Sequence, residues 1–256
     1  MHLSRTLSSV HTPRRRPLLD VRHMKDAELQ ELLLGSEWAP LFDLPSTLPK
    51  AVAAYFGNKT PCFIVSVLFA TAAARGGLAA SGGGPLTTAD LAVAGAVALF
   101  WMFQEWVLHD KVLHSEAEWL GKDIHAFHHD LPYYHVSIDG LKLAAAWFTL
   151  AAGAAAALFP TWGLALTATA TYTTCGLVYE FAHYISHTRV PLPPPLAALR
   201  AHHQNHHLVC SHKWLAFTLP AVDALMGTMP RHPRDVPEAE RNHNCHNRRP
   251  LSPLGQ

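Results

Sequence analysis

Histidine is the residue type through which this sequence could do chemistry. The chain of 256 residues contains 19 histidines, and most of them lie in internal clusters rather than in a terminal run. Neutral imidazole is the commonest nitrogen ligand for transition metals in proteins. A metal site is therefore predicted from four regularly spaced clusters: HDKVLH at 109–114, HAFHH at 125–129, HYISH at 183–187 and HQNHH at 203–207.

The spacing within each cluster predicts which imidazoles share a helix face. Side chains at positions i, i+3 and i+4 lie on one face, so HxxHH aims three imidazoles at one volume and HxxxH aims two. HxxxxH is different, because five residues turn about 140° around an α-helix. We therefore expect His109 and His114 to straddle the end of a helix, where it bends or stops.

Together the clusters supply ten candidate ligands, which is too many for one metal ion. Two ions with five ligands each would keep one octahedral position open, an arrangement that suits oxygen activation by iron better than it suits tetrahedral zinc. We expect two iron ions in the active protein, with zinc as an alternative bound metal. The candidate ligands are His109, His114, His125, His128, His129, His183, His187, His203, His206 and His207.

Acidic residues lie close to these clusters and could orient the imidazoles. A ligating histidine usually donates its second ring N–H to a carboxylate or a carbonyl. The candidates are Glu105, Asp110, Glu180 and Asp223, and for each a charge at a helix end is an equally good interpretation. His202, beside the fourth cluster, is not assigned to a metal.

The elements that must position the clusters are four apolar segments near residues 61–80, 91–108, 141–159 and 162–181. A bilayer core requires about 20 predominantly apolar residues per helix. Only Pro160 and Thr161 separate the last two segments, which predicts a tight hairpin. We expect an all-α integral membrane protein with about four transmembrane helices in two hairpins, capped by a histidine-rich di-metal region. A soluble alanine-rich helical bundle is the alternative.

Composition and charge favour the membrane interpretation. Hydrophobic residues make up 49% of the chain and charged residues 15%, against about 25% charged in soluble proteins. If all four segments cross, every histidine and every Lys or Arg except Arg75 falls on one side, as expected for the cytosolic face.

A net charge of +1 argues against nucleic-acid binding. Four cysteines without a CxxC pair predict a reducing compartment.

Three regions are expected along the chain. Residues 1–60 are a basic N-terminal tail followed by an interfacial segment, residues 61–230 are the membrane domain, and residues 231–256 are an irregular C-terminal tail. The first 20 residues contain several arginines and no acidic residue before Asp20, so an organelle-targeting peptide is an alternative to a cytosolic tail.

The order of the clusters, HxxxxH, HxxHH, HxxxH and HxxHH, resembles the fatty acid hydroxylase superfamily of integral membrane di-metal oxidases. Within it, the sequence is most similar to the fatty acid 2-hydroxylases. EWVLHDKVLH at 105–114 looks like the first box of that branch, and DGLKL at 139–143 looks like the start of its third span. LRAHHQNHHL at 199–208 and DALMGT at 223–228 look like its last box and closing motif. The resemblance covers roughly residues 95–230.

This resemblance implies an O2-dependent monooxygenase that hydroxylates a fatty acyl chain, with 2-hydroxylation favoured, at a non-heme di-iron centre. It also implies electrons from a cytochrome b5-type protein and its reductase. No heme-binding HPGG occurs in the sequence, so we expect that donor to be a separate protein. We expect the endoplasmic reticulum membrane, with the metal site facing the cytosol.

Two other functions remain open at this point. The first is a sterol or carotenoid hydroxylase or desaturase of the same superfamily, although these branches typically space their first or third box differently. The second is a histidine-rich metal transporter. Transporters normally hold their ligands near the middle of the membrane, whereas these clusters lie at or beyond the ends of the apolar segments.

Overall fold

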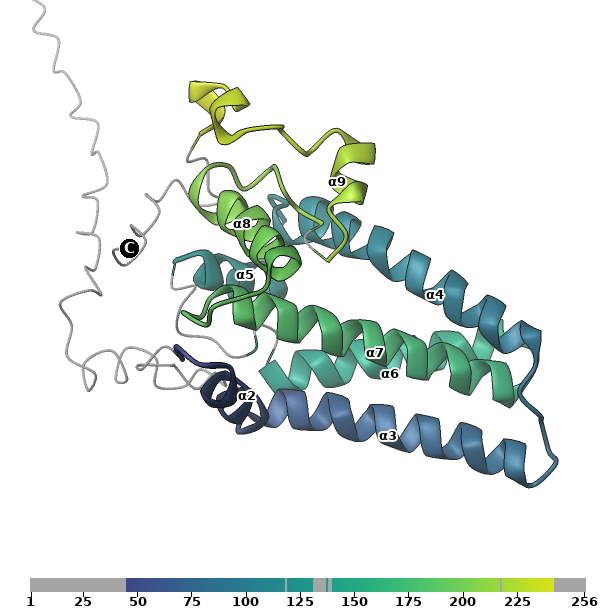
Figure 1. Ribbon diagram of the computed structural model, residues 1–256. Coiled ribbons are helices and arrows are strands. Elements are labelled where there is room, and N and C mark those ends of the chain that lie inside the picture. Colours follow the sequence, from purple (N-terminus) through teal and green to yellow (C-terminus); the bar gives the residue numbers. More distant parts are fainter. Residues whose placement is uncertain (1–44, 118, 131–136, 138–139, 217, 242–256) are drawn as a thin grey trace, which may run out of the picture. The chain divides into compact units, whose positions relative to one another are not determined.

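The computed structural model describes residues 45–117, 119–130, 137, 140–216 and 218–241, and every regular element in these residues is helical. The long helices are α3 (Lys59–Ala80), α4 (Thr88–Val107), α6 (Gly140–Leu158) and α7 (Trp162–Ser186). The shorter ones are α2 (Leu48–Phe56), α5 (Leu120–Asp130), α8 (Pro194–Leu208) and α9 (Ala221–Met226) (Figure 1). The predicted all-α class is confirmed. Most of the predicted N-terminal tail and the end of the C-terminal tail lie outside the described residues.

Among the described residues, three helices are long and apolar enough to cross a membrane: Lys59–Ala80, Thr88–Leu113 and Gly140–Leu158. They turn large apolar side chains outward. Phe69, Leu91 and Leu150 are 71%, 75% and 64% exposed, respectively. Apolar surface of this extent marks a membrane or a protein interface. These helices match three of the four predicted spans.

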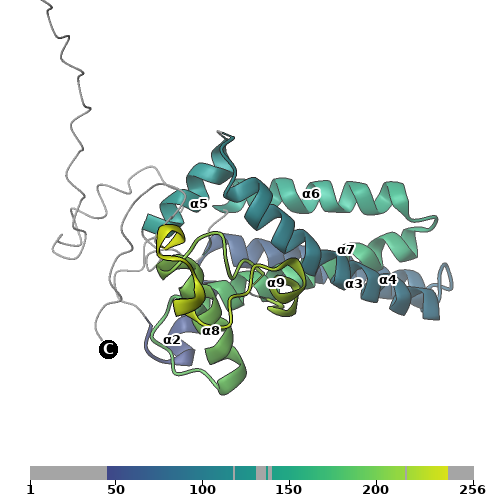
Figure 2. The same ribbon diagram turned by 90° about the horizontal axis from the view of Figure 1, so that it is seen from above.

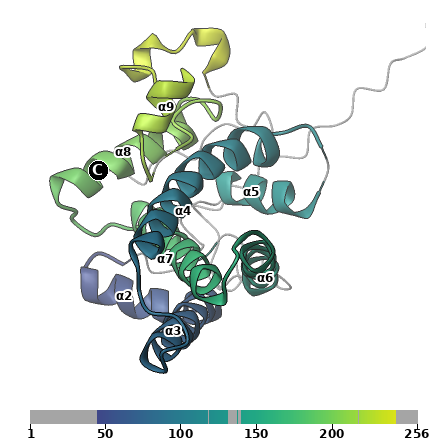
Figure 3. The ribbon, with the colours of Figure 1, turned by 90° about the vertical axis from the view of Figure 1, so that its right-hand side faces the viewer.

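The fourth predicted span, α7, is a helix of 25 residues, but it is not among the helices with the composition of a span. Its position explains the difference, because α3, α4 and α6 all pack against it (Figures 1 and 3). A shielded helix can carry polar residues: Thr169 and Thr173 are buried, and each hydroxyl donates a hydrogen bond to the carbonyl four residues earlier. The helix also continues past the predicted end at residue 181.

The central position of α7 changes the expected pairing of the helices. The predicted tight hairpin between α6 and α7 is present, and the Thr161 hydroxyl accepts a hydrogen bond from the Leu164 amide at 3.3 Å. By contrast, α3 and α4 make few contacts with each other and lie on opposite sides of α7 (Figure 1). The first two spans are therefore consecutive without being a closely packed pair.

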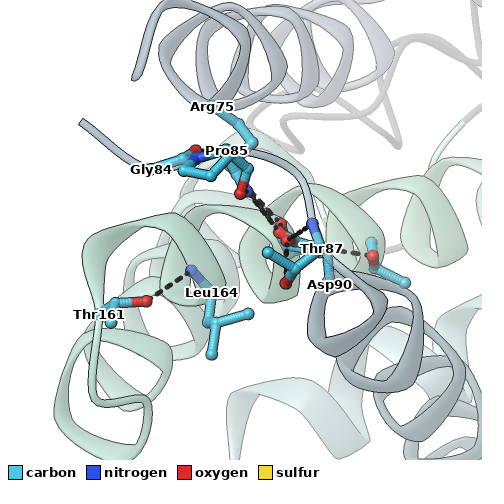
Figure 4. A network of polar contacts seen from close by, with 9 residues as sticks. Arg75, Gly84, Pro85, Thr87, Asp90, Thr161 and Leu164 are labelled. Carbon is cyan, nitrogen blue, oxygen red and sulfur yellow. Dashed lines mark hydrogen bonds and ion pairs between the residues drawn. The ribbon is translucent and has the colours of Figure 1, made fainter. Parts of the chain in front are cut away.

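Arg75, the exception to the predicted charge asymmetry, is buried in an ion pair at the far end of these helices (Figure 4). Its guanidinium lies 2.8 Å from Asp90 and donates hydrogen bonds to the carbonyls of Gly84 and Pro85. Asp90 also accepts a hydrogen bond of 2.6 Å from Thr167 on α7. The arginine therefore joins α3, α4 and α7, and it is not a free charge on that side of the membrane.

The other end of the long helices carries the short helices α2, α5 and α8 (Figure 2). We call the segment 108–114, the end of α7 from residue 183 to His187, α5 and α8 together the cap. Tyr55 and Ala51 of α2 pack on Tyr184 near the end of α7, and the Tyr184 hydroxyl donates a hydrogen bond to the Ala51 carbonyl. The described part of the predicted irregular tail contains two 3-10 turns, Pro233–Asp235 and Glu238–Glu240.

The buried ion pair predicts a strong effect on stability. Asp90→Asn leaves the buried Arg75 without its counter-charge, and breaking a buried pair is strongly destabilising. The melting temperature of the detergent-solubilised protein should fall by several degrees. Glu238→Gln is the control, because Glu238 is 87% exposed in its pair with Arg241 and such pairs contribute little. Equal melting temperatures for the two variants would contradict a structural role for the buried pair.

Candidate metal centre

The structure gathers all ten predicted ligand histidines into two groups, and within each group one ring nitrogen from every member lies within 4.8 Å of the others. The first group is His109, His114, His125, His129 and His206. The second group is His128, His183, His187, His203 and His207. All members are buried except His207, which is partly buried. The sequence predicted this set of residues, and the fold places them together at the cap.

The first pair of histidines straddles a helix end, as predicted: His109 lies in the last helical segment and His114 is the residue that caps it. The sequence did not predict that this last segment is a π-helix. Leu108–Leu113 continues α4 with π geometry, and the His114 amide donates a hydrogen bond to the His109 carbonyl at 3.1 Å. A turn closed between residues five apart stacks those residues on one face. Both imidazoles therefore enter the first group, with ring centroids 5.1 Å apart.

The two HxxHH clusters are divided between the groups, which corrects the expectation that each aims three imidazoles at one volume. On α5, His125 and His129 enter the first group and His128 the second. On α8, His206 enters the first group, while His203 and His207 enter the second. Each of these helices therefore contributes histidines to both groups.

The distances between the Nε2 atoms fit octahedral metal coordination. In the first group, neighbouring Nε2 atoms of His114, His125, His129 and His206 are 3.0–3.3 Å apart. In the second group, neighbouring Nε2 atoms of His128, His187, His203 and His207 are 2.9–3.1 Å apart. A metal bound about 2.1 Å from each nitrogen has adjacent octahedral ligands about 3.0 Å apart. The edge of a tetrahedron of the same bond length is about 3.4 Å. Four nitrogens of each group have these spacings, and a nitrogen of the fifth member, His109 or His183, lies within 4.8 Å of them. Such a set fits a six-coordinate ion with five histidine ligands and one open position.

Burial keeps these imidazoles neutral. Desolvation is the main cause, and the neighbouring histidines add to it. Together they hold the pKa well below 6.5 for His114, His125, His128, His129, His203, His206 and His207. A neutral imidazole has the lone pair that a metal requires.

Backbone carbonyls orient two of the rings in the first group. His109 Nδ1 lies 2.7 Å from the Leu215 carbonyl, and His206 Nδ1 lies 3.1 Å from the Lys213 carbonyl. A hydrogen bond to Nδ1 fixes the tautomer that directs the Nε2 lone pair at a metal. The sequence does not predict these two carbonyl contacts. Every residue has a backbone carbonyl, and no side-chain pattern marks the two that accept a hydrogen bond from a ligand histidine.

Asp223 holds a loop that contacts a candidate ligand histidine, rather than contacting one directly as the sequence predicts. It is fully buried, accepts hydrogen bonds from the backbone amides of Leu215 and Ala216 at 3.0 and 2.7 Å, and lies 2.8 Å from His202 Nε2. It therefore holds the loop whose Leu215 carbonyl meets His109. His202 belongs to neither histidine group and is instead the partner of this carboxylate.

The other predicted carboxylates have separate positions. Glu105 accepts a hydrogen bond from the Thr218 amide at 3.0 Å, which ties α4 to the loop after α8. Glu180 is buried on α7, one turn before His183. Asp110 pairs with the exposed Lys111. The predicted role of these three carboxylates in orienting imidazoles stays a prediction, and the sequence did not reveal the partners of Glu105 and Asp110.

Two apolar spaces lead away from the first group. The inner cavity, about 100 Å³, is lined by His109, Glu105, Glu180 and aromatic residues of α4, α6 and α7. The outer groove, about 440 Å³, continues between α4 and α6 toward Leu158 and is lined almost entirely by apolar residues. They share four lining residues, Gln104, Leu108, Trp147 and Tyr172. The arrangement places an apolar groove next to a cavity that reaches His109 of the first group.

Metal content gives a direct prediction. His128→Ala removes one nitrogen from the second group, so the metal content of the purified protein should fall from about two ions per chain to about one. His212→Ala is the matched control. Its exposed ring lies 5.8 Å from that of His114, but it belongs to neither group. Elemental analysis of both variants checks this. Equal losses would mean that the two groups do not define the ligands.

A second prediction concerns the pH dependence of the metal-free protein. The folded cap holds the histidine pKa values below 6.5, so below that pH the unfolded chain binds protons that the folded chain excludes. The free energy of unfolding should therefore be highest above pH 6.5 and fall as the pH is lowered. The slope is about 1.4 kcal/mol per pH unit for each excluded proton. Chemical unfolding of the metal-free protein at a series of pH values measures it, and constant stability down to pH 5 would contradict the burial.

Comparison with known proteins agrees with this geometry. The sequence model of the fatty acid hydroxylase family matches residues 94–228, a stretch that includes both histidine groups. Among solved structures, the fold is similar to that of full-length Scs7p, of which only the hydroxylase domain is visible. The sequence identity is 20% and the TM-score 0.54, with 70% of this chain and 69% of that chain covered. None of the curated proteins matches this chain. The family match spans more than half of the sequence, and the chain belongs to the fatty acid hydroxylase family.

Proposed function

We propose that this protein is an O2-dependent hydroxylase of fatty acyl chains. The observation that carries the proposal is the position of two buried five-histidine groups beside an apolar cavity, which His109 of the first group lines and which adjoins an apolar groove. Hydroxylation of a C–H bond consumes dioxygen, two electrons and two protons, and it releases one oxygen atom as water. Iron held by the two groups would supply the one-electron chemistry that dioxygen requires.

The outer groove supports a lipid substrate that enters from the bilayer. Both α4 and α6 pack against α7, and they make few contacts with each other (Figure 3). The groove between them is lined by side chains such as Phe100, Leu150 and Leu158, all of which are also exposed on the outer surface. An acyl chain in this groove would exchange lipid contacts for protein contacts of similar polarity, without passing through water.

The direction of the path favours a carbon near the polar end of the substrate. The histidine groups lie in the cap, whereas the outer groove runs along the apolar part of the helices toward the α6–α7 hairpin. The tail of an acyl chain would occupy the groove, and its head would lie at the cap. The inner cavity adds polar groups from Glu105, Glu180 and Tyr179 on the side of the metals. This orientation supports 2-hydroxylation over attack in the middle of the chain.

One polar contact sits where the two spaces meet. Gln104 Nε2 donates a hydrogen bond of 2.6 Å to the Tyr172 hydroxyl, and both side chains line the inner cavity and the outer groove. The Tyr172 ring is held edge-on to Trp101 with centroids 4.7 Å apart. We propose that this pair positions the substrate chain as it passes from the groove to the cavity.

The electrons are proposed to come from a separate cytochrome b5-type protein and its reductase, acting at the cap. Both histidine groups are in the cap, so a cytosolic orientation would place them on the side of a soluble donor. The charge asymmetry of the sequence supports this orientation, and residence in the endoplasmic reticulum is part of the same proposal.

Product analysis tests the proposed reaction. The full chain is expressed in a host that lacks its own acyl hydroxylase, together with a cytochrome b5 and its reductase, under isotope-labelled dioxygen. Mass spectrometry of the lipids should show acyl chains with a labelled hydroxyl at the 2-position, and His128→Ala should abolish them. Hydroxyl oxygen derived from water, or metal-loaded protein without any oxidised lipid, would contradict the proposal.

The proposed path predicts how the enzyme selects chain length. Ala151 lines the outer groove, so Ala151→Trp should shift the products toward shorter acyl chains by blocking room for the tail. The control is Ala156→Trp, because Ala156 is exposed on the same helix and does not line the groove. Lipid mass spectrometry of both variants measures the product distribution. An identical shift in the two variants would mean that the groove does not hold the substrate.

A further inference from the structure

The segment 219–229 follows the last histidine cluster and contains α9. It exposes several large apolar side chains. Leu219, Leu225, Met226 and Met229 are 41%, 70%, 41% and 43% exposed, respectively. Single exposed apolar residues are ordinary, but a contiguous group marks a surface that meets a partner or a membrane. The surroundings of this segment decide which of the two it meets.

The segment lies beside the part of α4 that belongs to a candidate span (Figure 1). Val222 packs with Trp106 and Met102 of α4, and the Trp106 indole donates a hydrogen bond of 2.9 Å to the Thr228 hydroxyl. Both α4 residues precede His109 on the helix, and at 1.5 Å per residue Met102 lies about 10 Å before it. The chain has thus left the cap and returned to the level of the apolar helix.

The surface of α4 next to this contact is itself apolar and open. Leu99, Phe103 and Val107 are 63%, 43% and 44% exposed. Positions three or four apart share one helix face, so these three residues form a stripe that borders Met102 and Trp106. The exposed residues of segment 219–229 therefore extend a surface that would face lipid if α4 spans the membrane.

The fold holds the segment in this position and keeps charge off its outer face. Asp223 is its single charged residue, and that side chain is fully buried against His202 and the amides of Leu215 and Ala216. Gly227, at φ 75°, ends α9 in the left-handed conformation that favours glycine, and the chain then turns back. The exposed large side chains of the segment are apolar and no charge faces outward, which lowers the cost of immersion in hydrocarbon.

We propose that segment 219–229 dips into the acyl region of the bilayer leaflet on the cap side, and that lipid chains are its partner. Continuity with the lipid-facing stripe of α4 favours this partner over a protein. The cap would then be held at the membrane at a second place besides the helix ends. This inference depends on the membrane position of α4 and not on the proposed reaction.

Labelling from within the bilayer tests the proposal on the unmodified full chain. The protein is reconstituted in phosphatidylcholine vesicles with a lipid-soluble diazirine, irradiated, and digested with trypsin. Cleavage after Lys213 and Arg231 releases the segment as one peptide, 214–231. Peptide 60–75, from α3, is the positive control, and peptide 235–241, which follows the segment, is the reference outside the membrane. We expect 214–231 to be labelled at least several-fold above 235–241.

A variant of the segment shows whether its labelling depends on insertion or only on how readily the diazirine reacts with this peptide. Leu225→Asn places an amide on the most exposed position and should reduce the labelling of 214–231, while 60–75 stays unchanged; Leu225→Met should preserve it. Labelling of wild-type 214–231 at the level of 235–241 would overturn the proposal. So would labelling that falls as the protein concentration rises, because a second copy of the chain would then cover this face.

Discussion

Ten imidazoles packed against one another in a buried cap impose the constraint on which the rest of the structure depends. Their Nε2 atoms approach to 2.9–3.3 Å. Neutral rings that carry their proton on Nδ1 oppose lone pairs at that distance, and protonated rings would oppose charges in a medium that solvates them poorly. A cation between the nitrogens resolves both conflicts, so metal binding and folding of the cap are coupled. Because α5 and α8 each serve both groups, the coupling extends to the cap as a whole.

The long helices provide the frame that this arrangement requires. At the centre, α7 packs against three other helices and extends beyond them to place His183 and His187. At the opposite end, the Arg75–Asp90 pair fixes the spacing of α3, α4 and α7. Because this pair fixes α4 and a short turn joins α6 to α7, α4 and α6 can remain apart along the outer groove while the histidines stay in register. The opening for a lipid chain and the rigidity of the cap are therefore compatible.

The sequence predicts much of this architecture because membrane helices and metal ligands have local signatures. Apolar length locates α3, α4 and α6, and histidine spacing identifies every member of both groups. Spacing could not show how the clusters divide, because that depends on where α5 and α8 lie relative to each other. Spacing also could not predict the π-helix at His109, because the expected positions of the imidazoles follow α-helical periodicity and the backbone is wider at Leu108–Leu113.

Tertiary partners form the second class of features that could not be predicted. The sequence offers Asp223 as a candidate for orienting an imidazole, yet its contacts with His202 and the Leu215 amide arise only when the chain folds back onto α4. The polar composition of α7 likewise makes sense once three helices surround it. In both cases the sequence identifies the residue, and the fold determines what it contacts.

X-ray absorption spectroscopy at the metal edge of the active protein tests the central claim most directly, because it reports the atoms bound to the metal. Two five-histidine groups predict about five nitrogen or oxygen neighbours at about 2.1 Å per metal, with the outer-shell scattering of imidazole and no sulfur. A four-coordinate shell or a metal–sulfur distance near 2.3 Å would contradict the account.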